Sequence, residues 1–308
     1  MFSALKIVTL LQMGKYVDIF IGSFGDYAHY LWQEVTLSAS YKAWYANYFY
    51  GLIIVSLVFF AWELLGPWRK GQRPIRKDFW LDVFYMFFNF FLFWLIAYNA
   101  VSNVVVEAFQ DFCINLGFEN GLALKIEVLP LYIKLTFAFL IKDFIHWNVH
   151  RLLHRVPFLW QFHKLHHSVE EMGFAAHLRF HWMEIIVYNS IQYIPMAILG
   201  FGLDEYYVVH MFALCVGHFN HSNVKLPLGI FKYVFNNPQM HLWHHAKEIP
   251  EKYGVNFGLT LSCWDYLFGT AYVPKENAEE QLGFKNIELY PKDFLGQILY
   301  PFRGYSRK

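Results

Sequence analysis

The chain of 308 residues is 56% hydrophobic and 21% aromatic, but only 16% of its residues are charged. A soluble domain has close to a quarter charged residues, so this composition favours a membrane protein. The formal net charge is +1 at pH 7, which excludes a global attraction to nucleic acid. Three separated cysteines, Cys113, Cys215 and Cys263, form no C-x-x-C pair and argue against a disulfide framework.

The first 47 residues mix polar and apolar side chains, and we expect a helical segment there that lies partly in the membrane interface. Apolar stretches follow, and several approach the roughly 20 residues that a helix needs to span hydrocarbon. They occupy residues 48–65, 79–105, 129–145, 184–202 and 205–217. The last two are short and favour a hairpin that enters the membrane deeply. The sequence therefore predicts an all-α, integral-membrane helical bundle of about four to five membrane helices.

Charges between these stretches predict the orientation of the chain. The loops at 106–128 and 202–205 are acidic. The loop at 66–78 is strongly basic, with Arg69, Lys70, Arg73, Arg76 and Lys77. Because Lys and Arg mark the cytoplasmic side, we expect the basic loop in the cytoplasm. Counting crossings then places the C-terminal part of the chain on that same side.

Three parts of the chain are expected from this topology. Residues 1–47 form an N-terminal segment, and residues 48–222 form the membrane domain with the first two histidine groups described below. Residues 223–308 form a cytosolic helical cap with the third group. All three histidine groups are therefore expected at the cytoplasmic face.

Histidines are concentrated in one region, because all but one of the 15 lie between His146 and His245. Eight of them form three groups, HRLLH at 150–154, HKLHH at 163–167 and HLWHH at 241–245. Positions i, i+3 and i+4 share one face of a helix, so each group directs two or three imidazoles together. A single buried histidine is usually a core residue, but packing gives no reason to repeat H-x-x-H-H. Neutral imidazole is a common metal ligand, so the pattern predicts a metal site.

Eight grouped histidines exceed the four ligands of one tetrahedral zinc ion and suit two metal ions. The predicted ligands are His150, His154, His163, His166, His167, His241, His244 and His245. Further candidates follow in two neighbouring segments, and they are His221, His218, His177 and His181. His221 is the best of these, because it lies at the cytoplasmic end of the last apolar stretch. We expect His146 to pack in the core and His29 to be unrelated.

Three charged residues are candidates for holding the ligands rather than the metal. Asp143 lies on one helical stripe with His150 and His154, and it could fix the tautomer of a ligand histidine. A carboxylate that reaches the membrane interface is the alternative for Asp143. Arg179 and Glu184 are expected to support the ligands from behind.

Other chemistry-bearing motifs are absent from the sequence. It has no G-x-G-x-x-G, P-loop, G-x-S-x-G or C-x-x-C-H motif. H-E-x-x-H is also absent, which disfavours a zinc-dependent membrane hydrolase with a glutamate base. A non-enzymatic metal-binding or transport protein would place its ligands near the bilayer midplane. A bis-histidine haem protein leaves the H-x-x-H-H groups unexplained, and these alternatives stay open.

The three histidine motifs, in this order among membrane spans, resemble the fatty acid hydroxylase / sterol desaturase superfamily. The resemblance covers roughly residues 130–272 and extends to DFIHWNVHRLLH, LWQFHKLHHSVEE, RFHWME, HSNVKLPLG, NNPQMHLWHH, YGVNFG and CWDYLFGTAY. The chain departs from the family pattern at His146, where an aromatic residue is more usual, and at Trp182, which replaces a proline. Neither position is a predicted ligand.

The resemblance implies an integral-membrane, non-haem di-iron oxygenase with a cytosolic helical cap that holds two iron ions. Zinc is a substitute that such a site accepts. By position, the eight grouped histidines are the implied ligands, and His221 is an addition. The implied reaction is hydroxylation or desaturation of an unactivated C–H bond in a sterol, fatty acyl or related lipid, with O2 and external electrons.

Electrons are expected from a separate donor, because the sequence has no flavin, haem or ferredoxin motif. A cytochrome b5-like protein, a ferredoxin or a reductase fits this role. The basic loop at 69–77 either docks such a donor or only contacts lipid headgroups. The aromatic-rich stretch at 84–94 either lines a lipid tunnel or faces the bilayer. The bacterial inner membrane and the endoplasmic reticulum are both open as locations.

Overall fold

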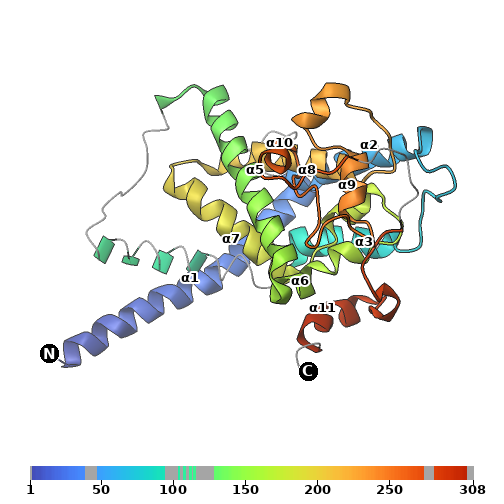
Figure 1. Ribbon diagram of the computed structural model, residues 1–308. Coiled ribbons are helices and arrows are strands. Elements are labelled where there is room, and N and C mark those ends of the chain that lie inside the picture. Colours follow the sequence, from blue (N-terminus) through green and yellow to red (C-terminus); the bar gives the residue numbers. More distant parts are fainter. Residues whose placement is uncertain are drawn as a thin grey trace. The chain divides into compact units, whose positions relative to one another are not determined.

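The computed structural model describes most of the chain (Figure 1). The described residues are 2–38, 47–93, 103–104, 107–108, 111–112, 114–115, 128–273 and 281–303. Within these ranges the regular elements are helices, and the β contacts are two isolated bridges, Phe235–Leu261 and Ala246–Leu282. The all-α expectation is therefore confirmed for the part of the chain that the structure describes.

The chain divides into two compact units. The first comprises Met1–Leu52 and Phe87–Ala123, and the second comprises Ile53–Met86 and Leu124–Lys308. In the first unit, the long helix α1 (Phe2–Thr36) ends near Glu34, whose Oε2 accepts a hydrogen bond from the Tyr48 amide over 2.7 Å. This bond satisfies one of the free N–H groups at the start of the next helix.

That next helix, α2 (Tyr48–Leu65), is long and apolar enough to cross a membrane, and it is the one such helix among the described residues. The second expected span begins as α3 (Phe79–Phe87) and the π-helix η2 (Phe88–Leu92), and residues 94–102 lie outside the described ranges. The three remaining expected spans fall within helices that carry charged residues. The expected number of membrane helices therefore stays a prediction.

Three helices form the framework of the second unit. They are α5 (Leu131–Arg155), α7 (Trp182–Ile198) and α8 (Leu203–His221). α5 and α7 lie side by side in Figure 1, and they pack with α8 around Ala138, Met196, Phe201 and Val209. A salt bridge of 2.7 Å between Lys134 and Glu205 joins α5 to α8. These contacts fix the first half of α5, and the first two grouped histidines lie at its other end.

The turn after α5 is determined by a proline. Pro157 disfavours helical geometry at the preceding Val156, whose φ and ψ are −93° and 112°. Proline is also well suited to the first position of a helix, and α6 (Pro157–His163) begins there. The sharp change of direction brings His163 back toward the end of α5.

Short helices carry the remaining groups of the second unit. They are η5 (His166–Ser168), η6 (Phe174–Leu178), η7 (Gly229–Tyr233), α9 (Pro238–His244), α10 (Cys263–Leu267), η8 (Ile287–Leu289) and α11 (Phe294–Arg303). The Asn237 side chain begins α9 by accepting hydrogen bonds from the Gln239 and Met240 amides. This cap and the proline that follows it stabilise a helix of only 7 residues.

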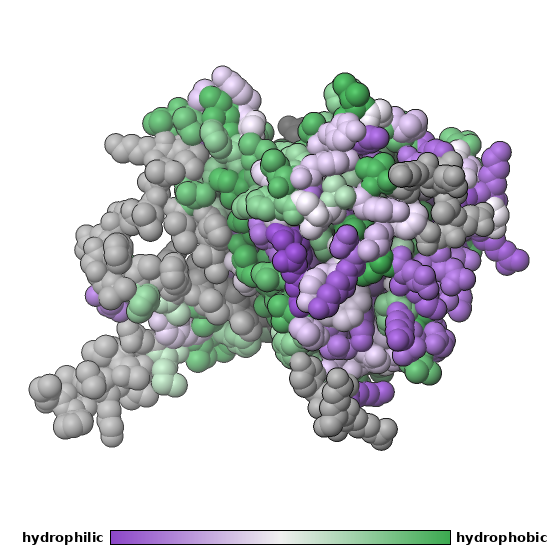
Figure 2. All heavy atoms as spheres, viewed as in Figure 1, coloured by the Kyte–Doolittle hydropathy of each residue, from purple (hydrophilic) through white to green (hydrophobic). Residues whose placement is uncertain are grey.

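The surface of the second unit is divided by polarity (Figure 2). Hydrophobic side chains gather along α5, where Leu131, Tyr132 and Phe137 are exposed by 61%, 71% and 52%. Hydrophilic side chains gather over the loop at 66–78. Exposed apolar area of this extent marks a membrane or protein contact.

Candidate metal centre

Nine buried or half-buried histidines converge in the second unit and form two groups. Within each group, one nitrogen of every ring lies within 4.8 Å of the others. The first group comprises His150, His154, His163, His167 and His244, and the second comprises His166, His221, His241 and His245. The folded chain thus brings together the eight histidines of the three sequence motifs and adds His221. Each motif contributes to both groups except HRLLH, which contributes only to the first.

The first group directs its Nε2 atoms inward. The Nε2 atoms of all five rings are buried and have no hydrogen-bond partner within the described part of the chain. Nδ1 of His150 donates to the Phe257 carbonyl and Nδ1 of His244 donates to the Val255 carbonyl, each over 2.8 Å. His154 is hydrogen-bonded to the backbone of Tyr253. Because Nδ1 carries the proton, Nε2 has a free lone pair for a metal ion.

These three backbone partners follow an alternating pattern along the chain. The backbone of this segment, YGVNFG, is not a regular strand, because Gly254 has a φ of 106°. The segment presents three carbonyls to three histidines from α5 and α9. Asn256, between them, has a φ of 55° and donates to the Met240 and Tyr272 carbonyls. This residue ties the segment to α9.

In the first group, Glu184 is the hydrogen-bond partner of the His163 ring. Its Oε2 accepts from Nδ1 of His163 over 2.6 Å, and both side chains are 1% exposed. Oε1 accepts from the amide of His181 over 3.3 Å. A carboxylate on the outer nitrogen fixes the tautomer and increases the basicity of the inner nitrogen. Glu184 therefore lies behind a candidate ligand, at the start of α7.

The second group has closely spaced Nε2 atoms. His221 Nε2 lies 3.0 Å from that of His241 and 3.3 Å from that of His166. His245 Nε2 lies 3.2 Å from that of His241. His221 Nδ1 donates to the Gly217 carbonyl over 2.8 Å, so its Nε2 is an acceptor. Ligands about 2.0–2.1 Å from one ion are separated by roughly 3 Å, so this spacing fits a shared metal ion.

Burial keeps these imidazoles neutral. Desolvation lowers the pKa of His150 to about 4 and that of His221 to about 3. It also places the pKa values of His163, His166 and His244 well below the usual 6.5. Neutral rings offer lone pairs at pH 7, and nine of them in two groups would otherwise leave buried nitrogens unpaired. The residues present therefore fit two metal ions, one for each group.

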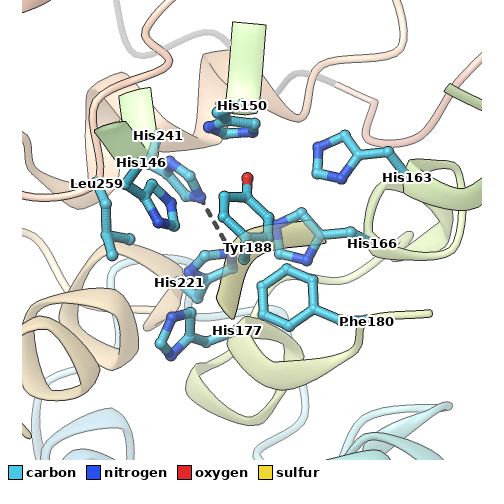
Figure 3. A pocket seen from close by; sticks show the side chains of 10 residues that line it. All are labelled: His146, His150, His163, His166, His177, Phe180, Tyr188, His221, His241 and Leu259. Atoms are coloured by element: carbon cyan, nitrogen blue, oxygen red, sulfur yellow. Dashed lines mark hydrogen bonds between the residues drawn. The ribbon is translucent and has the colours of Figure 1, made fainter. Parts of the chain in front are cut away.

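A small cavity of about 20 Å³ lies between the two groups (Figure 3). Its lining comprises His146, His150, His163, His166, His177, Phe180, Tyr188, His221, His241 and Leu259. A space of this size holds about one water-sized molecule or group. His146, which we expected to pack in the core, lies in neither group; it lines this cavity and stacks on Tyr188 with ring centroids 4.6 Å apart.

The other candidate histidines lie outside the two groups. His177 Nδ1 lies 3.0 Å from His218 Nδ1, and His218 Nε2 lies 3.2 Å from the Ser56 hydroxyl. His177 lies against Gly217, where a Cβ would meet its ring, so glycine makes room for this pair. His181 has a structural role, because its Nδ1 accepts from the Met183 amide at the start of α7. His29 contacts only Gln33 among its described partners, within α1.

Two charged candidates hold other parts of the chain. Asp143 does not bond a ligand histidine; it accepts from the Thr260 and Leu261 amides and from Trp264 Nε1. Arg179 is fully buried and pairs with Asp82 over 2.9 Å and with Asp78 over 3.2 Å. Both side chains therefore fix loops around the centre. Helical periodicity correctly placed Asp143 on the helix of His150 and His154. It did not predict the hydrogen-bond partner, because Thr260 lies 117 residues further along the chain.

Asp265 is a supporting residue that the sequence analysis did not identify. Its Oδ1 accepts from the Phe257 amide and from Trp147 Nε1, each over 3.0 Å. Its Oδ2 accepts from the Gly258 amide over 2.8 Å. Asp265 thus fixes the segment whose Phe257 carbonyl accepts from His150. Asp265 lies in the segment CWDYLFGTAY, which resembles a family segment. No sequence pattern showed that its side chain binds the backbone of residues 257 and 258.

Comparison with known proteins agrees with this site. Residues 135–270 match the family model of the fatty acid hydroxylases, and this segment contains both histidine groups. That segment is similar to the fatty acid hydroxylases, and the superfamily resemblance expected from the motifs is confirmed. No solved structure matches the chain.

Several relatives match part of this chain. Ornithine lipid hydroxylase OlsE of Rhizobium tropici is 31% identical over 179 residues, which cover 58% of this chain and 53% of that protein. Alkylglycerol monooxygenase of Homo sapiens is 34% identical over 43% of this chain and 29% of its own length. Methylsterol monooxygenase 1-3 of Arabidopsis thaliana is 22% identical over 70% and 72%. The match thus spans about half, or less, of the first two relatives.

Proposed function

We propose that this chain is an integral-membrane, non-haem di-iron oxygenase that hydroxylates an unactivated C–H bond of a lipid with O2. The observation that carries the proposal is the pair of histidine groups, whose inward nitrogens are neutral, buried and closely spaced. The hydroxylase and monooxygenase names of the relatives favour hydroxylation over desaturation.

Each part of the site has a role in this proposal. A bound iron pair would supply the activation of O2, which protein side chains do not provide. The two histidine groups would hold the metals, and the carbonyls of 253, 255 and 257 would keep the rings oriented. Phe180 and Leu259 would limit access of water to the cavity. The small cavity would position one group of the substrate near the metals.

A lipid substrate fits the surroundings of the site. α2 has the length and composition of a membrane span, and α5 exposes apolar side chains. The relatives' names specify an ornithine lipid, an alkylglycerol and a methylsterol, which are all lipids. We therefore propose a lipid substrate that reaches the site from the bilayer, with the metal centre at the cytoplasmic face.

A separate electron donor is part of the same proposal. Of the five basic residues in the 66–78 loop, only Lys70, Arg73 and Lys77 are exposed. Arg76 is buried against Asp82, and Arg69 donates to the Met172 carbonyl. An acidic electron-donor protein would therefore bind this loop through the side chains of Lys70, Arg73 and Lys77. Arg69 and Arg76 would hold the loop in place.

The zinc hydrolase alternative is disfavoured by the geometry. A hydrolase of this kind needs a carboxylate base that reaches the metal-bound water. The candidate ligand groups contain only histidines among the described residues, and Glu184 lies behind His163.

The proposal is tested with purified protein, iron, a reductant and O2, and product formation is followed by mass spectrometry on a panel of ornithine lipids, alkylglycerols and sterols. We expect a product 16 Da heavier than one lipid, and we expect His166→Ala or His244→Ala to abolish it. His29→Ala is the matched control, because His29 lies in α1 and in neither group. Full activity in either ligand variant would sink the assignment.

A further inference from the structure

The cavity between the histidine groups has a partly exposed rim. Six of its ten lining residues are buried histidines. The other four are only half-buried, and they are His146, Phe180, Tyr188 and Leu259. We refer to these four residues as the rim of the cavity. They come from α5, α7 and two loops, and Phe180 stacks on His166 with ring centroids 4.7 Å apart.

His146 contributes a hydrogen-bond donor to this rim. Gln192, which is 4% exposed, places its Nε2 3.2 Å from His146 Nδ1. An amide nitrogen only donates, so His146 Nδ1 accepts. The proton of the neutral ring is therefore on Nε2, and this nitrogen is a donor. Gln192 fixes the tautomer of a residue that is not in either metal group.

Tyr188 adds a second donor beside the first. It lies one helical turn before Gln192 on α7, and its ring stacks on that of His146 with an interplanar angle of 18°. In Figure 3 the Tyr188 hydroxyl is directed among the histidines that line the cavity. The rim therefore has a polar side, His146 and Tyr188, and an apolar side, Phe180 and Leu259.

We propose that His146 and Tyr188 determine specificity by donating hydrogen bonds to an oxygen acceptor of the lipid. This acceptor would lie next to the carbon that enters the cavity, and Phe180 and Leu259 would contact the adjoining hydrocarbon. A pure hydrocarbon would bury two donors without partners, which is unfavourable. A site that is built to hydrogen-bond its substrate rejects an analogue without the polar group. This inference rests on the proposed function, because it names the lipid feature that the same site selects.

The test is a binding experiment that requires neither electrons nor turnover. The full chain in lipid nanodiscs binds a spin-labelled stearic acid, and two competitors displace it: hexadecyl methyl ether and octadecane. These chains have equal length and differ by one oxygen in place of a methylene. One hydrogen bond contributes about a factor of ten in affinity. We expect the wild-type protein to prefer the ether by about tenfold or more.

Two variants remove a donor but keep the aromatic stacking, His146→Phe and Tyr188→Phe. Each should reduce the preference for the ether toward one, with little change in octadecane binding. Phe180→Leu is the matched rim control, and it should weaken both competitors alike. Thermal unfolding and metal content of each variant show whether the fold is intact, and Tyr188→Phe alone decides the question if His146→Phe does not fold.

Equal binding of the two competitors by the wild-type protein would overturn the inference. Retention of the ether preference in both variants would also overturn it. Because binding is measured without O2 or reductant, a failure to oxidise lipids would refute the proposed function while leaving the rim preference intact. Oxidation of alkanes and ethers with equal efficiency would refute the rim inference alone.

Discussion

In each candidate ligand, the hydrogen bond that Nδ1 makes determines whether Nε2 has a free lone pair for a metal ion. In the first group, backbone carbonyls or a carboxylate occupy Nδ1 of His150, His163 and His244, so that Nε2 is left for a metal ion. In the second group, the Gly217 carbonyl does the same for His221. The choice of tautomer is therefore made by residues that lie behind the candidate ligands.

Glu184 provides the sharpest test at this scale. Glu184→Gln replaces the carboxyl group beside His163 with an amide group of nearly equal size. Loss of such a partner typically weakens metal affinity by about 10–100-fold. We expect this loss in a competition titration with a metal chelator. Glu170→Gln, an exposed residue that pairs with Lys292, is the control and should leave metal affinity unchanged.

A wild-type affinity in Glu184→Gln would show that the 2.6 Å contact does not support the metal centre.

For single residues, local sequence spacing predicts some positions in the site and not others. The H-x-x-x-H and H-x-x-H-H spacings identified eight members of the two groups, because residues three or four positions apart lie close together in a helix or a tight turn. His146, expected to pack in the core, lies in neither group and stacks on Tyr188 from another helix, a contact that no local pattern indicates.

At the scale of elements, the centre depends on where helices end. Pro157 ends α5 and starts α6, and Asn237 with Pro238 starts α9, so both signals are visible in the sequence. The irregular segment at 253–258 is different. Its carbonyls reach residues on α5 and α9, and no local pattern indicates such distant partners.

Asp265 should therefore be sensitive to substitution. Asp265→Asn replaces one carboxylate oxygen by a donor, which faces the backbone amides of residues 257 and 258. Leaving a buried group unsatisfied costs about 1–3 kcal/mol. We expect thermal unfolding at a lower temperature, together with faster loss of metal during dialysis against a chelator.

Glu288→Gln is the control for this variant, because Glu288 is exposed on the short helix η8. Unchanged metal retention in Asp265→Asn, with lowered stability, would restrict Asp265 to a general structural role. Unchanged stability would contradict the account of this segment.

At the scale of the whole molecule, the charge pattern predicts orientation. The basic loop at 66–78 and the C-terminal part of the chain are expected on the cytoplasmic side. A reporter fused after Lys308 should therefore be active in the cytoplasm, and a reporter placed in the acidic 106–128 loop should be active outside. Reversal of these two signals would contradict the topology.

The fold class and the metal-binding region were predictable because composition and histidine spacing are local properties. The number of membrane helices stays a prediction, because the apolar stretches at 129–145 and 184–217 lie in helices that also carry Lys134, Glu205 and the buried Lys142. Such helices bury polar groups against one another and have no uniform apolar surface. Their depth in the bilayer depends on packing rather than on sequence alone.

The most direct test of the central claim is the metal content of the purified chain, measured by elemental analysis with an optical spectrum of the same sample. The two histidine groups predict close to two iron ions per chain and no haem band. In His166→Ala, which removes a member of the second group only, the content should fall toward one. A single zinc ion that iron does not replace on reconstitution, or no bound metal, would contradict the di-iron assignment.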